Sequence, residues 1–403
     1  MMQRVYMDAN ATTPLLPEVM AAMRPWFDDN FGNASSIHFH GQRARAAVDH
    51  ARETVATLLG CRPAEIVFTS GGTEGDNLAL FGILQSGGML QPGDHLITTA
   101  VEHHAVLHPA EHLRDRGILV TFLPVSSAGV IDPEDVRRAL RPQTKLISVM
   151  MANNETGVLQ PVAEIGRIAQ EADVYYHTDA VQTAGKLPLD VKAIGCDLLT
   201  LSGHKMYAPQ GTGALYVRRG TQLEPLFFGG LHERHRRAGT ENVPGIVGLG
   251  KAAEVAMAGL DAGIPSRTAA LRDRLEMRIL QSVDEAGVNG GEVPRVANTT
   301  NLWFDHVEAE ALVIALDLKG LAISGGSACQ SGATEPSHVL LAMGLSEERA
   351  RASVRFSLMK TATEEDADFA AALVPQAVAR LRELSPVYAK KTAVTVSGGS
   401  LHG

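Results

Sequence analysis

The sequence contains little cysteine and no surplus of positive charge. Its 403 residues include three cysteines, Cys61, Cys196 and Cys329, which stand far apart and form no C-x-x-C pair. An odd number of cysteines at this spacing argues against a disulfide framework and against a cysteine-rich zinc site. We therefore expect the protein to be located in a reducing cytoplasm. The formal net charge of −9 lacks the cationic surplus that general nucleic-acid binding requires, and we expect no nucleic-acid partner.

Long hydrophobic runs and targeting signals are also missing. No stretch of 18 apolar residues occurs, so we expect no membrane span. The first eight residues contain neither an apolar h-region nor a small-residue cleavage site, which again favours the cytoplasm. The fifteen histidines form no H-E-x-x-H motif. His104 and His108 stand four residues apart without an obvious third ligand, so we expect no resident metal site.

The sequence does contain an alternation of short apolar runs and helical patterns over its first two thirds. This alternation predicts an α/β fold with a mostly parallel sheet that is covered on both faces. In such sheets the chemistry lies at the carboxyl ends of the strands. We expect strands near 65–69, 95–99, 118–123, 145–150, 174–178 and 197–201.

The pattern changes after the turn signal Asn289-Gly290-Gly291. Strands and helices that follow it indicate a smaller α+β unit. We expect a large domain over 16–260, a small domain over 1–15 and 261–388, and a mobile Ser/Gly-rich tail over 389–403.

Two charged residues directly follow buried strands. Lys205 follows the apolar run at 198–201, and burial of a lysine favours the neutral amine that forms Schiff bases. Taken alone, a lysine that reaches to solvent is the simpler interpretation. Asp179 ends the preceding strand and is suited to pair with a protonated pyridine nitrogen, although, taken alone, a helix N-cap is the favoured interpretation.

Two loops complete the candidate chemistry. Thr69-Ser70-Gly71-Gly72-Thr73-Glu74 joins a strand to a helix, where backbone N–H groups favour a phosphate, although an ordinary turn remains open. Cys329 lies in the small-residue loop Gly325–Gly332, which suits an exposed and mobile thiol. The alternative is a buried, inert cysteine, which fits Cys61 and Cys196 better.

Taken together, the motifs resemble the cysteine desulfurases of the NifS/IscS type, in the class V aminotransferase superfamily. The resemblance spans about residues 5–387. It rests on Asp8 to Pro14, Phe31 to Asn33, Gly72 to Glu74, Ala152 to Gly157, His177 to Gln182, Ser202 to Lys205, Arg236 to Asn242, Gly326 to Cys329 and Ser353 to Ser357. It implies the fold type I architecture of pyridoxal-phosphate (PLP) transferases, with a seven-stranded sheet in the large domain.

The resemblance also implies roles around a PLP cofactor. Lys205 would bind PLP as a Schiff base, Asp179 would pair with its pyridine nitrogen and Gln182 would contact its phenolic oxygen. His103 would stack on the ring and move protons. The remaining cofactor contacts would come from Gly72, Thr73, Asn154, Ser202, Gly203, His204 and, across a homodimer interface, Thr240.

The same resemblance implies a substrate and a route for its sulfur. Asn33, Asn154 and Arg355 would hold L-cysteine, with the Arg355 fork on its carboxylate. Cys329 would take the sulfur as a persulfide, and alanine would leave. A sulfur-acceptor or iron–sulfur scaffold protein would receive the sulfur, for cluster assembly or other thiolation. Cys329 would contact metal only transiently, through this persulfide.

Four alternative functions remain open from the sequence. A selenocysteine lyase and a cysteine sulfinate desulfinase would use the same scaffold. A class V aminotransferase would leave Cys329 without a purpose. A non-enzyme scaffold would keep the fold only for partner binding, and the presence of Lys205 argues against it.

Overall fold

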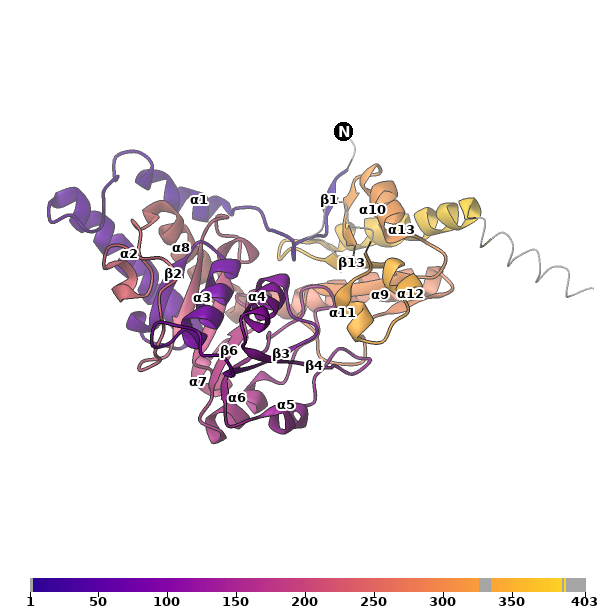
Figure 1. Ribbon diagram of the computed structural model, residues 1–403. Coiled ribbons are helices and arrows are strands. Elements are labelled where there is room, and N and C mark those ends of the chain that lie inside the picture. Colours follow the sequence, from indigo (N-terminus) through magenta and orange to yellow (C-terminus); the bar gives the residue numbers. More distant parts are fainter. Residues whose placement is uncertain (1–2, 326–334, 386–387, 389–403) are drawn as a thin grey trace, which may run out of the picture.

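The structure is a computed structural model that describes residues 3–325, 335–385 and 388 (Figure 1). The expectations for Cys329 and for the tail over 389–403 lie outside these residues.

A seven-stranded sheet forms the centre of the larger part (Figure 1). Its order is β2 (Ile66–Thr69), β8 (Gly213–Val217), β7 (Leu198–Ser202), β6 (Tyr175–Asp179), β5 (Thr144–Ser148), β3 (His95–Thr99) and β4 (Leu119–Leu123). Only β8 runs antiparallel to its neighbours in this sheet. The expected α/β fold is therefore confirmed. The six strands expected from apolar runs are present, and β8 is the one that the apolar pattern missed.

Helices cover both faces of this sheet, which explains why its strands are apolar on both sides. Along β2, Ile66 and Phe68 join one core, whereas Val67 joins the core on the opposite face. The first core is covered by α1 (Pro17–Met23), α2 (Phe39–Leu59), α5 (Pro133–Ala139), α6 (Val162–Glu171), α7 (Val191–Ile194) and α8 (Val243–Asp261). The second is covered by α3 (Gly72–Leu84) and α4 (His104–Asp115).

Helix α8 is long and apolar enough to suit a membrane span by length and composition alone. Val243, Ile246 and Leu249 on this helix are buried in the core that it shares with α2. The two helices cross closely, since a Cβ at Gly250 would lie 2.7 Å from the Cα of Ala51. Packing against α2 therefore accounts for the apolar composition of α8.

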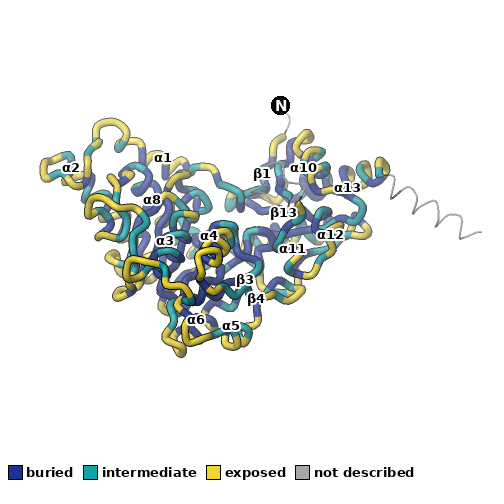
Figure 2. The backbone as a smooth tube through the Cα atoms, viewed as in Figure 1, coloured by how far each residue is buried: buried dark blue, intermediate teal, exposed yellow. Residues whose placement is uncertain are grey.

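A separate core lies in the smaller part of the molecule (Figure 2). Its antiparallel sheet has the order β12 (Ser324–Gly325), β13 (Ser353–Ser357), β10 (Thr299–Phe304) and β9 (Ala286–Val288), and β1 (Val5–Tyr6) pairs in parallel with β11 (Leu321–Ala322). The helices of this part are α9 (Ile264–Ser282), α10 (Ala309–Asp317), α11 (His338–Ala342), α12 (Glu347–Arg351) and α13 (Glu364–Leu384). The division into two domains, with boundaries at 15 and 260, stays a prediction.

Residues 7–13, here called the crossing segment, pass from the smaller part to the larger one. The backbone N–H of Ala9 donates to the carbonyl of Ser357, and that of Thr13 donates to the carbonyl of His204. The segment therefore lies beside the end of β7, where the large sheet was expected to carry its chemistry.

Candidate active site

A cavity of about 280 Å³ opens at the carboxyl ends of β6 and β7. Residues of the large sheet, the crossing segment and β13 line it. Ten of the predicted site residues are among them: Gly72, Thr73, His103, Asn154, Asp179, Gln182, Ser202, His204, Lys205 and Arg355. Residues that are separated by up to 283 positions in the sequence thus meet in one place.

The other predicted residues within the part of the chain that the structure describes do not line this cavity. Gly203 lies directly behind it, where a Cβ would come within 2.8 Å of the Thr212 Oγ1. Asn33 is exposed, and its Oδ1 accepts a hydrogen bond from Ser35 at 2.8 Å. Thr240 lines a different pocket, beside Phe227. The roles of Asn33 and Thr240, the latter across a second subunit, stay predictions.

Lys205 ends a short 3-10 helix, Gly203–Lys205, that directly follows β7. Its Nζ donates to the carbonyls of Asn10 at 2.5 Å and Ala11 at 2.6 Å. The crossing segment therefore holds the amine at the cavity wall. A lysine that simply extends into solvent, the simpler interpretation of the sequence, is not what the structure contains.

Asp179 ends β6 as a buried carboxylate, and its Oδ1 accepts from the Val181 N–H at 2.8 Å. Asp76, on α3, lines the same cavity and is also buried. Burial and the negative charge of Asp179 raise the pKa of Asp76 well above its usual value. Burial also raises the pKa of Asp179, but the Val181 N–H and Lys205 oppose this rise. Asp76 therefore keeps its proton, and Asp179 is the carboxyl group that ionises.

His103 is the N-cap of α4, and its Nδ1 accepts from the Ala105 N–H at 3.1 Å. Burial first, and then the charge of Lys205, lower the pKa of His103 to about 4. The ring is therefore neutral at pH 7, and because Nδ1 accepts, its proton lies on Nε2. It brings a donor N–H to the cavity without adding a charge.

The turn between β2 and α3 forms the anion-binding end of the cavity. Gly71, the N-cap of α3, has φ 153° and ψ −172°, a conformation that side-chain-bearing residues rarely adopt. A Cβ at Gly72 would lie 2.9 Å from the Val181 Cγ2, so only glycine lets this turn come so close. The first N–H groups of α3 have no partner within the helix and favour a phosphate. Thr73 and Ser202 line the same end.

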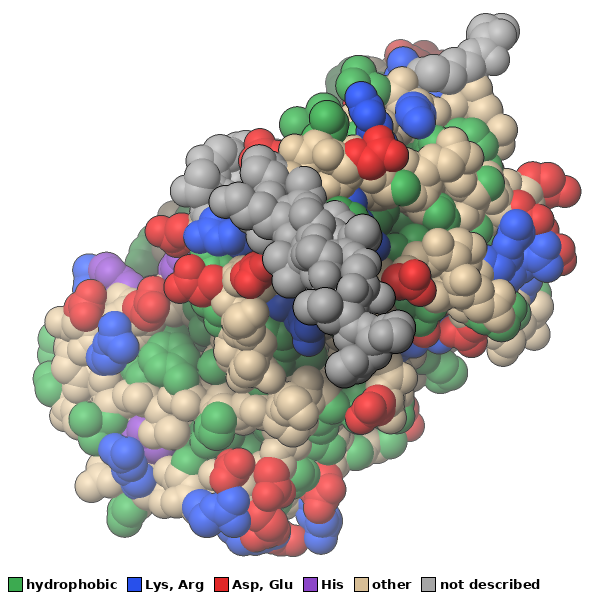
Figure 3. All heavy atoms as spheres, turned by 90° about the vertical axis from the view of Figure 1, so that its right-hand side faces the viewer, with side chains coloured by type: hydrophobic (Ala, Val, Ile, Leu, Met, Phe, Trp, Pro, Cys, Tyr) green, Lys and Arg blue, Asp and Glu red, His purple; other side chains and the backbone are tan. Residues whose placement is uncertain are grey.

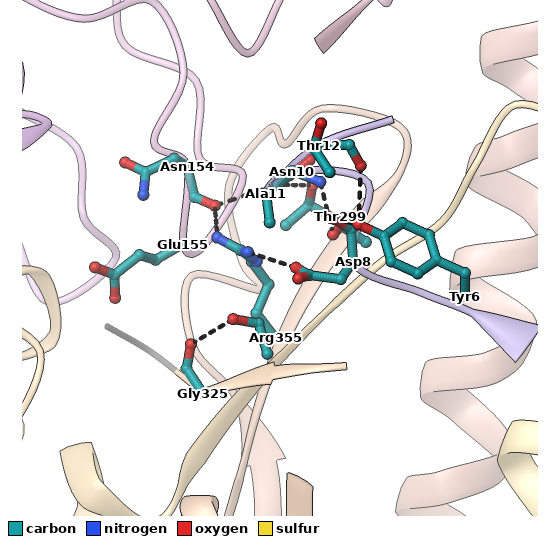
Figure 4. A network of polar contacts seen from close by, with 12 residues as sticks. Tyr6, Asp8, Asn10, Ala11, Thr12, Asn154, Glu155, Thr299, Gly325 and Arg355 are labelled. Carbon is teal, nitrogen blue, oxygen red and sulfur yellow. Dashed lines mark hydrogen bonds and ion pairs between the residues drawn. The ribbon is translucent and has the colours of Figure 1, made fainter. Parts of the chain in front are cut away.

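Arg355, on β13, lines the cavity from the smaller part of the molecule. Figure 4 shows its contacts with Asp8 and Asn154. Its Nη1 donates to the Asn154 carbonyl at 2.8 Å, and its Nη2 pairs with the Asp8 Oδ1 at 2.7 Å. The side chain is only 2% exposed. Its Nε has no hydrogen-bond partner among the described residues. A buried guanidinium with a spare donor is suited to a ligand carboxylate.

Several residues at this site were missed by the sequence analysis. Asp8 and Asn10 belong to the opening motif, but their roles depend on contacts with residues far along the chain. Glu102 is buried behind His103, and burial raises its pKa to about 8. A usable signal existed for Asp76, which lies one helical turn after Gly72 on the same helix.

The histidines near the cavity are packed against one another. The rings of His104 and His108 stack at 4.7 Å, and His338 lies 4.8 Å from His104. Within residues 3–325, 335–385 and 388, no group of three or more His, Cys, Asp and Glu side chains is arranged to hold a metal ion.

Comparisons with known proteins agree with this geometry. The aminotransferase class-V family matches residues 5–369. The cysteine desulfurase IscS of Anaeromyxobacter dehalogenans is 50% identical over 387 residues, which is 95% of each chain. The chain therefore belongs to the aminotransferase class-V family, and the resemblance to cysteine desulfurases of the NifS/IscS type is confirmed.

Solved structures support the same assignment. A NifS-like protein is similar with a TM-score of 0.86 and 34% identity, covering 94% of this chain and 100% of its own. SspA in complex with cysteine is similar with a TM-score of 0.77 and 38% identity, covering 88% of this chain and 98% of its own. The fold type I expectation is thus confirmed.

Proposed function

We propose that this protein is a PLP-dependent cysteine desulfurase, which converts L-cysteine to L-alanine and transfers the sulfur to Cys329 as a persulfide. The observation that carries the proposal is that Lys205, Asp179 and Arg355 line a single cavity. The cysteine desulfurase relative and the cysteine-bound neighbour support it. They favour it over a selenocysteine lyase, a cysteine sulfinate desulfinase or an aminotransferase.

The residues present fit PLP. The cavity offers an amine at Lys205, a buried carboxylate at Asp179 and, at the start of α3, N–H groups for a phosphate. Gln182 would contact the phenolic oxygen of the cofactor, and His204 would contact its phosphate. When bound there, PLP supplies an electron sink for the negative charge that forms on the substrate Cα.

The residues of the chain have separable roles in this reaction. Arg355 holds the substrate carboxylate with the help of Asn154, and Asn33 would join them. Lys205 would hold the cofactor as a Schiff base. His103, neutral and protonated on Nε2, moves protons within the cavity.

Sulfur transfer requires a thiolate. The Cys329 thiolate attacks the substrate sulfur, an S–S bond forms, and the bond between that sulfur and the substrate Cβ breaks. The Cβ then takes a proton, which yields alanine. The persulfide passes its outer sulfur to an acceptor or iron–sulfur scaffold protein, and contact with metal is limited to that transfer.

Assembly and location follow from the same family. The protein would act as a cytoplasmic homodimer in which Thr240 reaches the phosphate of the neighbouring subunit's cofactor. Among the described residues on the face in Figure 3, Lys and Arg side chains are interspersed with Asp and Glu rather than gathered in one basic patch. This surface supports a protein partner rather than a nucleic acid.

The test is to incubate the purified protein with PLP and L-cysteine. We expect alanine to accumulate, and mass spectrometry to find one added sulfur on Cys329. Cys329→Ala should lose both, whereas the matched control Cys196→Ala should keep both, because Cys196 is buried away from the cavity. Absence of alanine in the wild-type reaction would overturn the proposal.

A further inference from the structure

A second lysine, Lys186, lies behind the cofactor site and has no role in the chemistry described above. It stands four residues after Gln182, in the turn segment that follows β6. Its Nζ donates to the Gln182 Oε1 at 3.0 Å and to the Asn10 Oδ1 at 3.1 Å. Both of these contacts are neutral amide oxygens rather than carboxylates.

The surroundings of Lys186 disfavour its charge. Burial, and then the nearby charges of Lys205 and Arg355, lower the pKa of Lys186 to about 7. No Asp or Glu lines the cavity between the two parts that Lys186 borders on its other side. A lysine in this position is better suited to donate hydrogen bonds than to form an ion pair.

Lys186 helps to orient the amide of Gln182. A protonated lysine has only donors, and the Asn10 carbonyl on the other side of the amide can only accept, so the atom of Gln182 that faces Lys186 is the oxygen Oε1. The amide nitrogen Nε2 then lies on the other side, where it donates to the Asn10 carbonyl at 3.2 Å and has a second hydrogen available. Gln182 lines the cavity, so that hydrogen is available to a ligand there.

Lys186 acts on Lys205 through Asn10 as well. The Asn10 side chain is fixed on both ends, because its Nδ2 donates to the Thr299 Oγ1 at 2.8 Å while its Oδ1 accepts from Lys186 and Asn298. The carbonyl of the same residue accepts from the Lys205 Nζ. One amine thus supports two neighbours of the cofactor.

We propose that Lys186 is a positioning residue, which turns the Gln182 N–H toward the phenolic oxygen of the cofactor and steadies the Asn10 carbonyl that holds Lys205. The inference deepens the proposed function and rests on it, because the phenolic oxygen belongs to PLP. A donor to that oxygen lowers the proton affinity of the nitrogen that joins Lys205 to PLP, since the oxygen lone pairs stabilise that proton. Loss of Lys186 therefore raises this affinity.

The experiment measures the absorbance of the PLP-loaded protein against pH. In Lys186→Met, the nitrogen that joins Lys205 to PLP should lose its proton at a higher pH, at a roughly tenfold lower proton concentration than in wild type. This is the effect expected of one hydrogen bond to a charged group. Lys186→Gln keeps donors and loses the charge, so its titration should stay within about threefold of wild type. The surface variant Lys192→Met is the matched control. A wild-type titration in Lys186→Met, or a Met-like titration in Lys186→Gln, overturns the inference.

A double-mutant cycle with Gln182→Ala isolates the contact. We expect Gln182→Ala to produce most of the Lys186→Met shift, and Lys186→Met to add little in that background. Full additivity contradicts the inference. If a variant does not fold, a neutron crystal structure of the loaded wild type, which distinguishes the amide oxygen from the amide nitrogen, carries the same test: Lys186 should contact the Gln182 oxygen while the Gln182 nitrogen contacts the cofactor. A wild-type protein that forms no lysine-bound band refutes the proposed function instead.

Discussion

The two walls of the cavity are built in different ways. On the large-sheet wall, each group lies at or near the end of a strand. Asp179 ends β6, Lys205 ends the short helix after β7, and His103 caps α4. On the opposite wall, Arg355 is held by Asp8 and Asn154, from 347 and 201 positions away in the sequence. Local strand-to-helix geometry therefore places the groups for chemistry at one edge of the sheet, where the crossing segment also holds Lys205. Contacts between the two parts of the molecule position Arg355 for recognition.

The large-sheet wall should carry the largest effect. Lys205→Ala should lower the rate of alanine formation by at least about 10³-fold, because no other amine takes its place at the end of β7. The absorbance band of lysine-bound PLP should also be missing. Lys251→Ala, on the surface pair with Glu254, is the control and should keep both. Substantial activity in Lys205→Ala would assign the chemistry elsewhere.

The recognition wall should respond in KM. Arg355→Lys should raise KM for L-cysteine about 100-fold, because an ammonium cannot contact Asp8, Asn154 and a carboxylate with the geometry of a planar fork. The kcat at saturating cysteine should fall much less. Steady-state kinetics separate the two constants, and a fall confined to kcat would show that Arg355 serves the chemistry instead.

Asp8 should give a smaller effect on the same wall. Asp8→Ala removes one of the two anchors of the Arg355 guanidinium and should raise KM roughly tenfold. Asp8→Asn keeps an acceptor for Nη2, so its KM should stay within about threefold of wild type. Equal KM values in the two variants would mean that the charge of Asp8, rather than its position, is what Arg355 requires.

The last expected effect concerns stability rather than activity, and it lies behind the large-sheet wall. Glu102 keeps its proton in the folded protein up to about pH 8, whereas its usual pKa is 4.5. Between these values the unfolded state releases a proton that the folded state retains, so this group favours folding less as the pH rises. Glu102→Gln removes that dependence.

Thermal unfolding at several pH values measures this effect. The Tm of wild type should fall relative to that of Glu102→Gln as the pH rises from about 5 to 8. The exposed substitution Glu53→Gln should follow wild type throughout. Parallel Tm curves for wild type and Glu102→Gln would contradict the buried, protonated state of Glu102.

The same contrast explains what the sequence could and could not predict. Asp179 and Lys205 stand at the ends of apolar runs, so strand patterns located them, and motif resemblance supplied their roles. The Asp8–Arg355 pair and the Asn10 contacts have no local signature, because only the folded chain brings them together. Strand β8 was missed because its apolar run has only four residues and directly follows Gly211 and Gly213, which indicate a turn. The role proposed for Thr240 would require a second chain and stays a prediction.

The crossing segment has a consequence for how this enzyme tolerates change. Asp8 forms an ion pair with the Arg355 guanidinium. Asn10 and Ala11, two and three positions later, accept hydrogen bonds from the Lys205 amine. An insertion or deletion in this short stretch would disturb substrate capture and cofactor attachment in a single event. We therefore expect residues 7–13 to tolerate few insertions or deletions, although they lie near the amino terminus.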